Sequence, residues 1–138
     1  MLDLNSDYRG IVAVSARRLT ANGTVNGSTI DLANAHGINF ILTTGVLVDA
    51  DATLTGYLFH GDAANLSDGM VVTQDDIIGL LSDFSFNDSN DNAVKQIGYK
   101  GIKRYLQMRL TLAGGAGGNA DVCAVAFVQR RVTPFYFG

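Results

Sequence analysis

One cysteine and two histidines are the side chains in this sequence best suited to nucleophilic or metal chemistry. Cys123 lies in the apolar run Val122–Val128, where a thiol is desolvated and stays protonated, so we expect it in the core. His36 precedes a predicted strand and His60 ends one, both beside polar turns. Neither has the nearby ligand partner typical of a zinc site, and no Gly-x-Ser-x-Gly elbow occurs. The sequence therefore predicts no nucleophile, no metal site and no cofactor.

The carboxylates are equally uninformative about catalysis. All 13 acidic residues are aspartate, and they cluster in predicted loops, where water keeps carboxylates ionised. This argues against a glycosidase-type pair. Asp88, Asn90 and Asn92 alternate as at the start of a calcium loop, but Ala93 and Tyr99 occupy the positions that need glycine and glutamate. We interpret residues 87–92 as an Asx-rich turn and expect the protein not to be an enzyme.

Two further segments resemble binding motifs only in part. The glycine run 114–118 lacks the Gly-Lys-Ser/Thr of a phosphate-binding loop, so we interpret it and its flanks as a hairpin. Residues 99–105 mix basic and aromatic side chains, as single-strand nucleic-acid binders do, but they form one cluster in a protein of net charge -3. No stretch approaches the roughly 20 apolar residues of a membrane span. We expect neither nucleic acid nor a membrane as partner.

The amino-acid composition favours strands over helices as the main elements of the fold. The chain has no glutamate and only three lysines, so the charged residues that favour surface helices are nearly missing. Sixteen glycines and 47% hydrophobic residues suit short strands joined by polar turns. A length of 138 residues matches one domain with its own core.

Alternation of apolar and polar residues locates the strands. It is clearest over residues 38–43, 53–60 and 105–112. Residues 122–128 are apolar at every position, which predicts a strand covered on both faces. About eight short strands at regular spacing predict an all-β fold, an antiparallel β-sandwich or a jelly-roll-like barrel with extended terminal arms.

Two segments are left with alternatives. Residues 24–32 contain Asn26-Gly27, so they form either a short hairpin or an extended segment with a tight reversal. Residues 73–76 resemble a capping box and precede an apolar group, which suits a helical turn. Gly79 weakens that helix, and a short hairpin is an equal alternative for residues 75–82.

The chain divides into an arm at 1–10, a β-sandwich domain at 11–129 and an arm at 130–138. The first arm lacks the basic and apolar regions of a signal peptide, and one cysteine cannot form an internal disulfide, so we expect synthesis and use inside a cell. Both ends combine basic and aromatic side chains that suit contact with a neighbouring subunit. The interface candidates are Tyr8, Arg9, Arg130, Arg131, Pro134, Phe135, Tyr136 and Phe137.

Charge is distributed unevenly along the chain. Residues 49–91 carry nine aspartates and no basic residue, whereas residues 92–138 carry seven basic residues and one aspartate. Such asymmetry is typical of a solvated surface with loops of one sign, but it also makes facing surfaces of an oligomer complementary. Both interpretations remain open at this point.

Residues 95–112, KQIGYKGIKRYLQMRLTL, end one strand in a Gly-Tyr-x-Gly turn and begin the next with Lys-Arg-Tyr. With the glycine run, the apolar last strand and a short proline-containing tail, this order resembles a group of small virion proteins of tailed bacteriophages. The likeness covers about residues 11–134, and only the block 98–105 is specific. The aromatic tail and the longer acidic middle depart from the pattern, which leaves the station in the virion open.

The resemblance implies a non-enzymatic capsid decoration or cement protein. Such a protein is made in the host cytoplasm, binds the major capsid protein on the capsid surface and acts as an oligomer, for which a trimer is the preferred order. Two alternatives are a head–tail connector or tail component and a carbohydrate-binding module that uses Tyr57, Phe59, Tyr99 and Tyr105.

Overall fold

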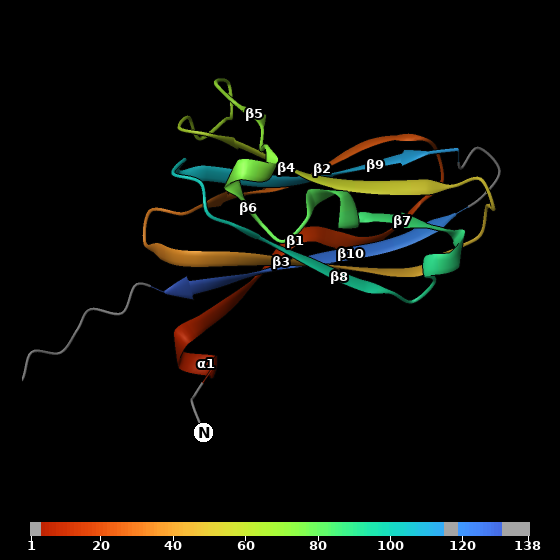
Figure 1. Cartoon of the computed structure of the whole chain (residues 1–138), viewed down its shortest axis with the longest axis horizontal. Coiled ribbons are helices and arrows are strands. Elements are labelled where there is room, and N and C mark those ends of the chain that lie inside the picture. The colour runs from red at the N-terminus through yellow and green to blue at the C-terminus, as the bar shows by residue number, and fades with distance from the viewer. Residues whose placement is uncertain (1–3, 115–118, 131–138) are drawn as a thin grey trace, which may run out of the picture.

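Ten strands in two layers make up most of the computed structural model, which describes residues 4–114 and 119–130 (Figure 1). The strands are β1 Tyr8–Leu19, β2 Gly23–Asp31, β3 Ala35–Leu47, β4 Thr53–Gly61, β5 Met70–Val71, β6 Ile77–Ile78, β7 Ser85–Asn87, β8 Val94–Tyr99, β9 Tyr105–Ala113 and β10 Ala120–Arg130. The helical turns are α1 Leu4–Asp7, η1 Gln74–Asp76, η2 Leu81–Asp83 and η3 Asp88–Asn90. The predicted all-β fold is confirmed. The count exceeds eight because β5, β6 and β7 have only two or three residues each.

The two sheets have the connectivity of a jelly roll. One sheet has the order β1-β10-β3-β8-β6, the other has β2-β9-β4-β5, and β7 pairs with β4. All of the pairings are antiparallel. Each connection between consecutive long strands, from β1 through β4 and from β8 through β10, crosses to the opposite sheet. This wrapping of one sheet over the other distinguishes a jelly roll from a simple meander.

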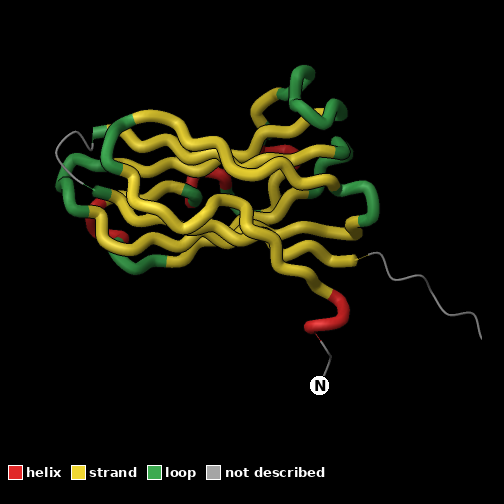
Figure 2. The backbone as a smooth tube through the Cα atoms, turned by 180° about the vertical axis from the view of Figure 1, so that it is seen from behind, coloured by secondary structure: helices red, strands yellow, loops and turns green. Residues whose placement is uncertain are grey.

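The predicted hairpin around the glycine run is wrong. Strand β9 belongs to one sheet and β10 to the other, so these two strands lie in different layers of the sandwich and do not pair with each other (Figure 2). Both strands have a strongly apolar inner face, and each sheet needs one of them to cover the core. Local turn composition cannot distinguish a hairpin from such a crossover.

The core lies between the sheets and is built by strict alternation. Inward residues of β9 and β10 are almost fully buried, whereas the residues between them are not. Strand β10 departs from the prediction of two covered faces. Ala124 and Ala126 are completely buried inside, but Phe127 is 40% exposed on the outside, and Cys123 is half-buried rather than in the core. In the single chain, the apolar side chains on the outer face of β10 therefore stay partly exposed.

The two ambiguous segments match their predicted alternatives only in part. Residues 24–31 remain extended through Asn26-Gly27 as part of β2, with an irregular register between Asn26 and Thr29. Gly27 lies so close to the Ala13 carbonyl oxygen that a Cβ there would overlap it, so the glycine serves close packing instead of a turn. Residues 74–83 form a 3-10 helical turn after Thr73, the short strand β6 and a second 3-10 turn, so the helical turn is present but the apolar residues Ile77 and Ile78 lie in a strand. The Thr73 side chain makes no capping bond.

Candidate functional site

The two ends of the described chain lie side by side. Tyr8 is paired with Gln129 and Arg9 with Val128, in the antiparallel ladder of β1 and β10. Strand β1 begins at Tyr8, so residues 8–10 of the expected arm belong to the sheet, and Arg130 is the last residue of β10. The sequence indicated two contact segments but not that they start from one end of the fold, as they do in Figure 1. Of the interface candidates, Arg131, Pro134, Phe135, Tyr136 and Phe137 lie outside the described residues.

A cavity of about 490 Å³ opens where the chain ends meet. Arg9 and Arg130 line it, together with Ile11 and Val128 and the turn after β2. Within residues 4–114 and 119–130, neither arginine forms an ion pair. The remaining lining residues are Asp31, Ala33, Asn34 and Ala35. Two guanidinium groups above an apolar floor are suited to hold a carboxylate-bearing segment of another protein.

The acidic group of this cavity is already satisfied. Arg104 Nε and Nη2 donate to the two oxygens of Asp31 at 3.0 Å each. Asp31 also accepts the backbone N–H of Ala33 at 3.0 Å. The Arg104 hydrogen bonds, followed by the Ala33 bond, hold the pKa of Asp31 below its ordinary value. Because Asp31 is committed to Arg104, the charge at the cavity that can still pair with a partner is positive.

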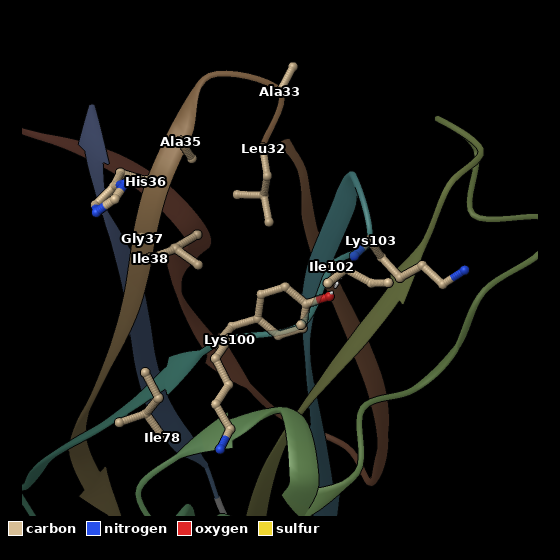
Figure 3. Close-up of a pocket in the computed structure, with 12 residues that line it drawn as sticks. Leu32, Ala33, Ala35, His36, Gly37, Ile38, Ile78, Lys100, Ile102 and Lys103 are labelled. Atoms are coloured by element: carbon tan, nitrogen blue, oxygen red, sulfur yellow. Dashed lines mark hydrogen bonds between the residues drawn. The ribbon is translucent and has the colours of Figure 1, made fainter. Parts of the chain in front are cut away.

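A second cavity of about 490 Å³ lies between the start of β3 and the loop after β8 (Figure 3). Leu32 and Ile38 point into it, whereas His36 and Lys103 point away. The Lys103 ammonium lies 2.7 Å from Asp62. The lining of this cavity is mixed, with the apolar side chains of Leu32 and Ile38 beside the polar groups of Tyr99 and Lys100.

Residues of the specific block 98–105 line this cavity. The packing around its two glycines and Tyr99 explains why these residue types occur there. Gly98 leaves room for the side chain of Ile78 on the neighbouring strand, where a Cβ would come within 3.0 Å. At Gly101 a Cβ would overlap the Tyr99 ring. Burial raises the pKa of Tyr99, and its hydroxyl lies 2.8 Å from His60 Nδ1. His60, which we expected at a polar turn, is itself buried at 7% exposure and serves as an internal partner.

The outer surface of the sheet β1-β10-β3-β8-β6 is a further candidate. Val12, Val125 and Ile41 form one row across it, since each is the register partner of the next. The adjacent row contains Phe127 and Ile78. We call this surface, without the Arg18–Asp121 ion pair at one end, the uncharged face; its outward residues are Tyr8, Gly10, Val12, Asn39, Ile41, Thr43, Ile78, Val94, Gln96, Gly98, Cys123, Val125, Phe127 and Gln129. None of them carries a formal charge.

The four aromatics of the expected carbohydrate platform do not come together. Tyr57, Phe59 and Tyr105 belong to β4 and β9, whereas Tyr99 is buried in the opposite sheet. The Arg109 guanidinium lies 3.7 Å from the centre of the Phe59 ring. It covers the ring on which a sugar would have to stack.

The loop after β7 uses its oxygens internally. Asn87 Oδ1 accepts the backbone N–H of Ser89, and Asn90 Oδ1 accepts that of Asn87, each at 3.0 Å. Asp91 Oδ1 accepts the N–H of Leu47 at 2.7 Å and fixes the loop to β3. This supports the Asx-turn interpretation of residues 87–92. In the described part of the chain, no group of three potential metal ligands occurs, and no helix there is both long and apolar enough to cross a membrane.

Comparisons with known proteins give a likeness of fold. No protein-family model and no curated protein matches the chain. Among solved structures, a chain from the structure of the infectious bursal disease virus Gx strain is similar, with a TM-score of 0.50 and 11% identity. The match covers 89% of this chain and 32% of that one, so the protein spans about a third of the length of the viral chain. At this identity the likeness shows a shared β-rich fold.

Proposed function

We propose that the protein is a structural component of a bacteriophage virion, specifically a capsid decoration or cement protein. It binds the major capsid protein on the outer surface of the shell and stabilises the shell as an oligomer. It has no catalytic role. The observation that carries the proposal is the convergence of both chain ends at one end of a jelly-roll sandwich, beside two arginines whose charge is not neutralised by the described residues.

The fold supports a shell protein in general terms. Jelly rolls recur in viral capsid domains, and the similar solved chain comes from a virus. The resemblance of residues 95–112 to tailed-phage virion proteins supports the finer assignment to a phage shell. The contacts of the specific block with Ile78, Asp62 and Asp31 also make it a structural corner.

The chain ends provide a plausible means of attachment. Arg9 and Arg130 lie beside the same cavity, so carboxylates of a capsid loop could bind both through charge-assisted hydrogen bonds. The sequence continues from Arg130 into a tail with three aromatic residues and one proline. Aromatic side chains commonly anchor protein interfaces by filling pockets on the partner. Attachment would then combine a charged contact with an apolar one.

The test is binding to purified capsids that lack the protein, measured by co-sedimentation. The double substitution Arg9→Ala/Arg130→Ala should weaken binding by about tenfold or more, and increasingly at low salt. Removal of residues 133–138 should abolish it with the domain still folded. Arg17→Ala/Lys100→Ala removes the same charge outside the cavity beside Arg9 and Arg130, at two exposed residues that form no ion pair within the described residues, and should bind as the unchanged protein does. Undiminished occupancy after both changes at the chain ends would refute attachment through them.

A further inference from the structure

We propose that the uncharged face binds the same face of a second copy of this chain and so forms a twofold-symmetric dimer of sandwiches. This deepens the proposed function, because it names the surface through which copies of the shell protein associate. The biological role of the dimer rests on the proposed function, but the dimer itself does not. Dimerisation can be measured on the isolated protein without capsids.

The apolar side chains of this face form a central row with further exposed residues on either side, and Asn39, Gly98 and Thr43 lie between some of them. Val12 is 55% exposed, Phe127 40%, Ile78 59% and Val94 65%. The ladder register joins them, since Val12, Val125 and Ile41 are consecutive partners in the central row. Scattered apolar residues are normal on a surface, but a row of apolar residues across a sheet face marks an interaction site.

The absence of charge on this face favours a second copy of the chain as its partner. The uncharged face has hydroxyl and amide groups at Thr43, Asn39 and Gln96, and these can donate and accept hydrogen bonds with their own copies. A surface that meets itself across a twofold axis must avoid like charges, and a face without any charge satisfies that condition. The adjoining charges at one end, Arg18 and Asp121, already neutralise each other at 2.7 Å. A strongly charged partner would instead bury its charges against valine and isoleucine at high cost.

The outer face of the other sheet shows the contrast. There β4 and β9 present Thr53, Thr55, Gln107, Arg109 and Thr111 together with the aromatic residues Tyr57, Phe59 and Tyr105. This face therefore has apolar rings as well, but it also has a charged group, because the Arg109 guanidinium lies 3.7 Å from the centre of the Phe59 ring. The uncharged face differs from it in having no formal charge among its outward residues.

The size of the face suits a weak dimer. Its 14 outward residues lie on strands β1, β10, β3, β8 and β6. With strands about 4.8 Å apart and about 6.6 Å between successive outward residues of one strand, these residues cover about 440 Å² in projection. Two such faces would bury about 900 Å², which is the size of a weak, concentration-dependent interface.

Face-to-face packing is favoured over edge pairing. Strand β1 forms the edge of this sheet, but its register is irregular between Val12 and Val14 and again before Arg17. Irregular register and edge charges oppose the addition of another strand. Two sheets that pack by their faces lie about 10 Å apart and interdigitate side chains, as the two sheets inside the sandwich do.

The experiment is sedimentation equilibrium of the full chain over a wide concentration range. The unchanged protein should reach a mass of two chains. Val12→Lys/Val94→Lys places two charges at opposite borders of the face, at positions exposed enough to tolerate lysine, and should raise the dimer dissociation constant by about 100-fold or more. The control Thr53→Lys/Thr55→Lys adds the same charge to the other outer face and should leave the constant unchanged. Circular dichroism of each variant confirms that it is folded.

Cys123 provides a second measurement that needs no substitution. It lies in the row of the face between Val125 and Asp121 and is half-buried in the single chain. Its rate of reaction with N-ethylmaleimide should fall as the protein concentration passes through the dimer dissociation constant. A monomer at all concentrations with a constant thiol rate would overturn the proposal. So would an oligomer that the face lysines leave intact, or a monomer whose lysine variant loses only capsid binding.

Discussion

The hydroxyl of Tyr99 in β8 lies 2.8 Å from Nδ1 of His60 in β4, so that one hydrogen bond joins the two sheets inside the protein. The phenolic oxygen also accepts the backbone N–H of Lys103 at 3.3 Å. A phenolic hydroxyl has one hydrogen and two lone pairs, so it can serve both contacts with either tautomer of the His60 ring. The two rings meet edge to face, with centres 5.7 Å apart. This contact holds the start of the block 98–105 in place.

Loss of that hydroxyl should destabilise the sandwich. Tyr99→Phe keeps the ring but leaves a buried nitrogen of His60 without its partner, which costs about 1–3 kcal/mol. Tyr57→Phe is the matched control, because the Tyr57 hydroxyl has no partner among the described residues. Urea unfolding of both variants measures the difference. Equal midpoints would show that the bond between the sheets contributes nothing.

A methyl group at Gly56 should be poorly tolerated. A Cβ at this position in β4 would overlap the ring of Phe84, which is completely buried beneath the strand. Gly56→Ala should therefore destabilise the protein by about 1–3 kcal/mol through overpacking. Gly10→Ala is the control, since the nearest atom to its Cβ is a methyl carbon of Val125 at 3.9 Å. Thermal unfolding of the two variants should give a clearly lower midpoint for Gly56→Ala alone.

Stability should decline in acid through a few identifiable aspartates. Side-chain hydrogen bonds from Arg104, Lys103 and Arg18 lower the pKa values of their aspartate partners, and backbone N–H groups lower that of Asp68. A carboxyl whose folded pKa lies below its unfolded pKa stabilises the fold fully above the unfolded value, about 3.9. That contribution disappears as the pH falls through the folded value. The free energy of unfolding should thus lose this contribution below about pH 4.

The acid dependence can be assigned by substitution. Asp31→Asn removes the carboxyl that Arg104 and Ala33 bind, and should flatten the fall in stability below about pH 4. Asp83→Asn changes an exposed aspartate that accepts no hydrogen bond from the described residues, and should leave the slope as it is. An identical slope in all three proteins would contradict this assignment. The exposed position of these pairs also predicts a smaller effect at high salt.

Periodicity gave the strands but not their partners. The alternation over 38–43, 53–60 and 105–112 was sufficient to place β3, β4 and β9, because a half-buried strand must alternate. The connection from β9 to β10 was wrong, since a glycine-rich segment suits a hairpin and a crossover equally well. Cys123 was misplaced for a related reason: a fully apolar strand shows no period, so its covered face cannot be identified.

The candidate site was predictable only in part. Terminal arginines and aromatics indicated contact segments, but the pairing of Tyr8 with Gln129 depends on strand order, which the sequence does not encode locally. The uncharged face is assembled from five strands that come from distant parts of the chain. Its signal in the sequence was the unbroken apolar run 122–128, which we interpreted as a strand covered twice within one domain. On the proposed account, the second cover comes from another copy.

The central claim is that this protein is part of a phage shell and attaches by the end of the sandwich that holds Arg9 and Arg130. Cryo-electron microscopy of purified virions tests it most directly. The account predicts two-layered sandwiches at regular positions on the outside of the capsid, with that end against the major capsid protein. Sandwiches arranged in a ring at the head–tail junction, or particles that lack the protein, would contradict it.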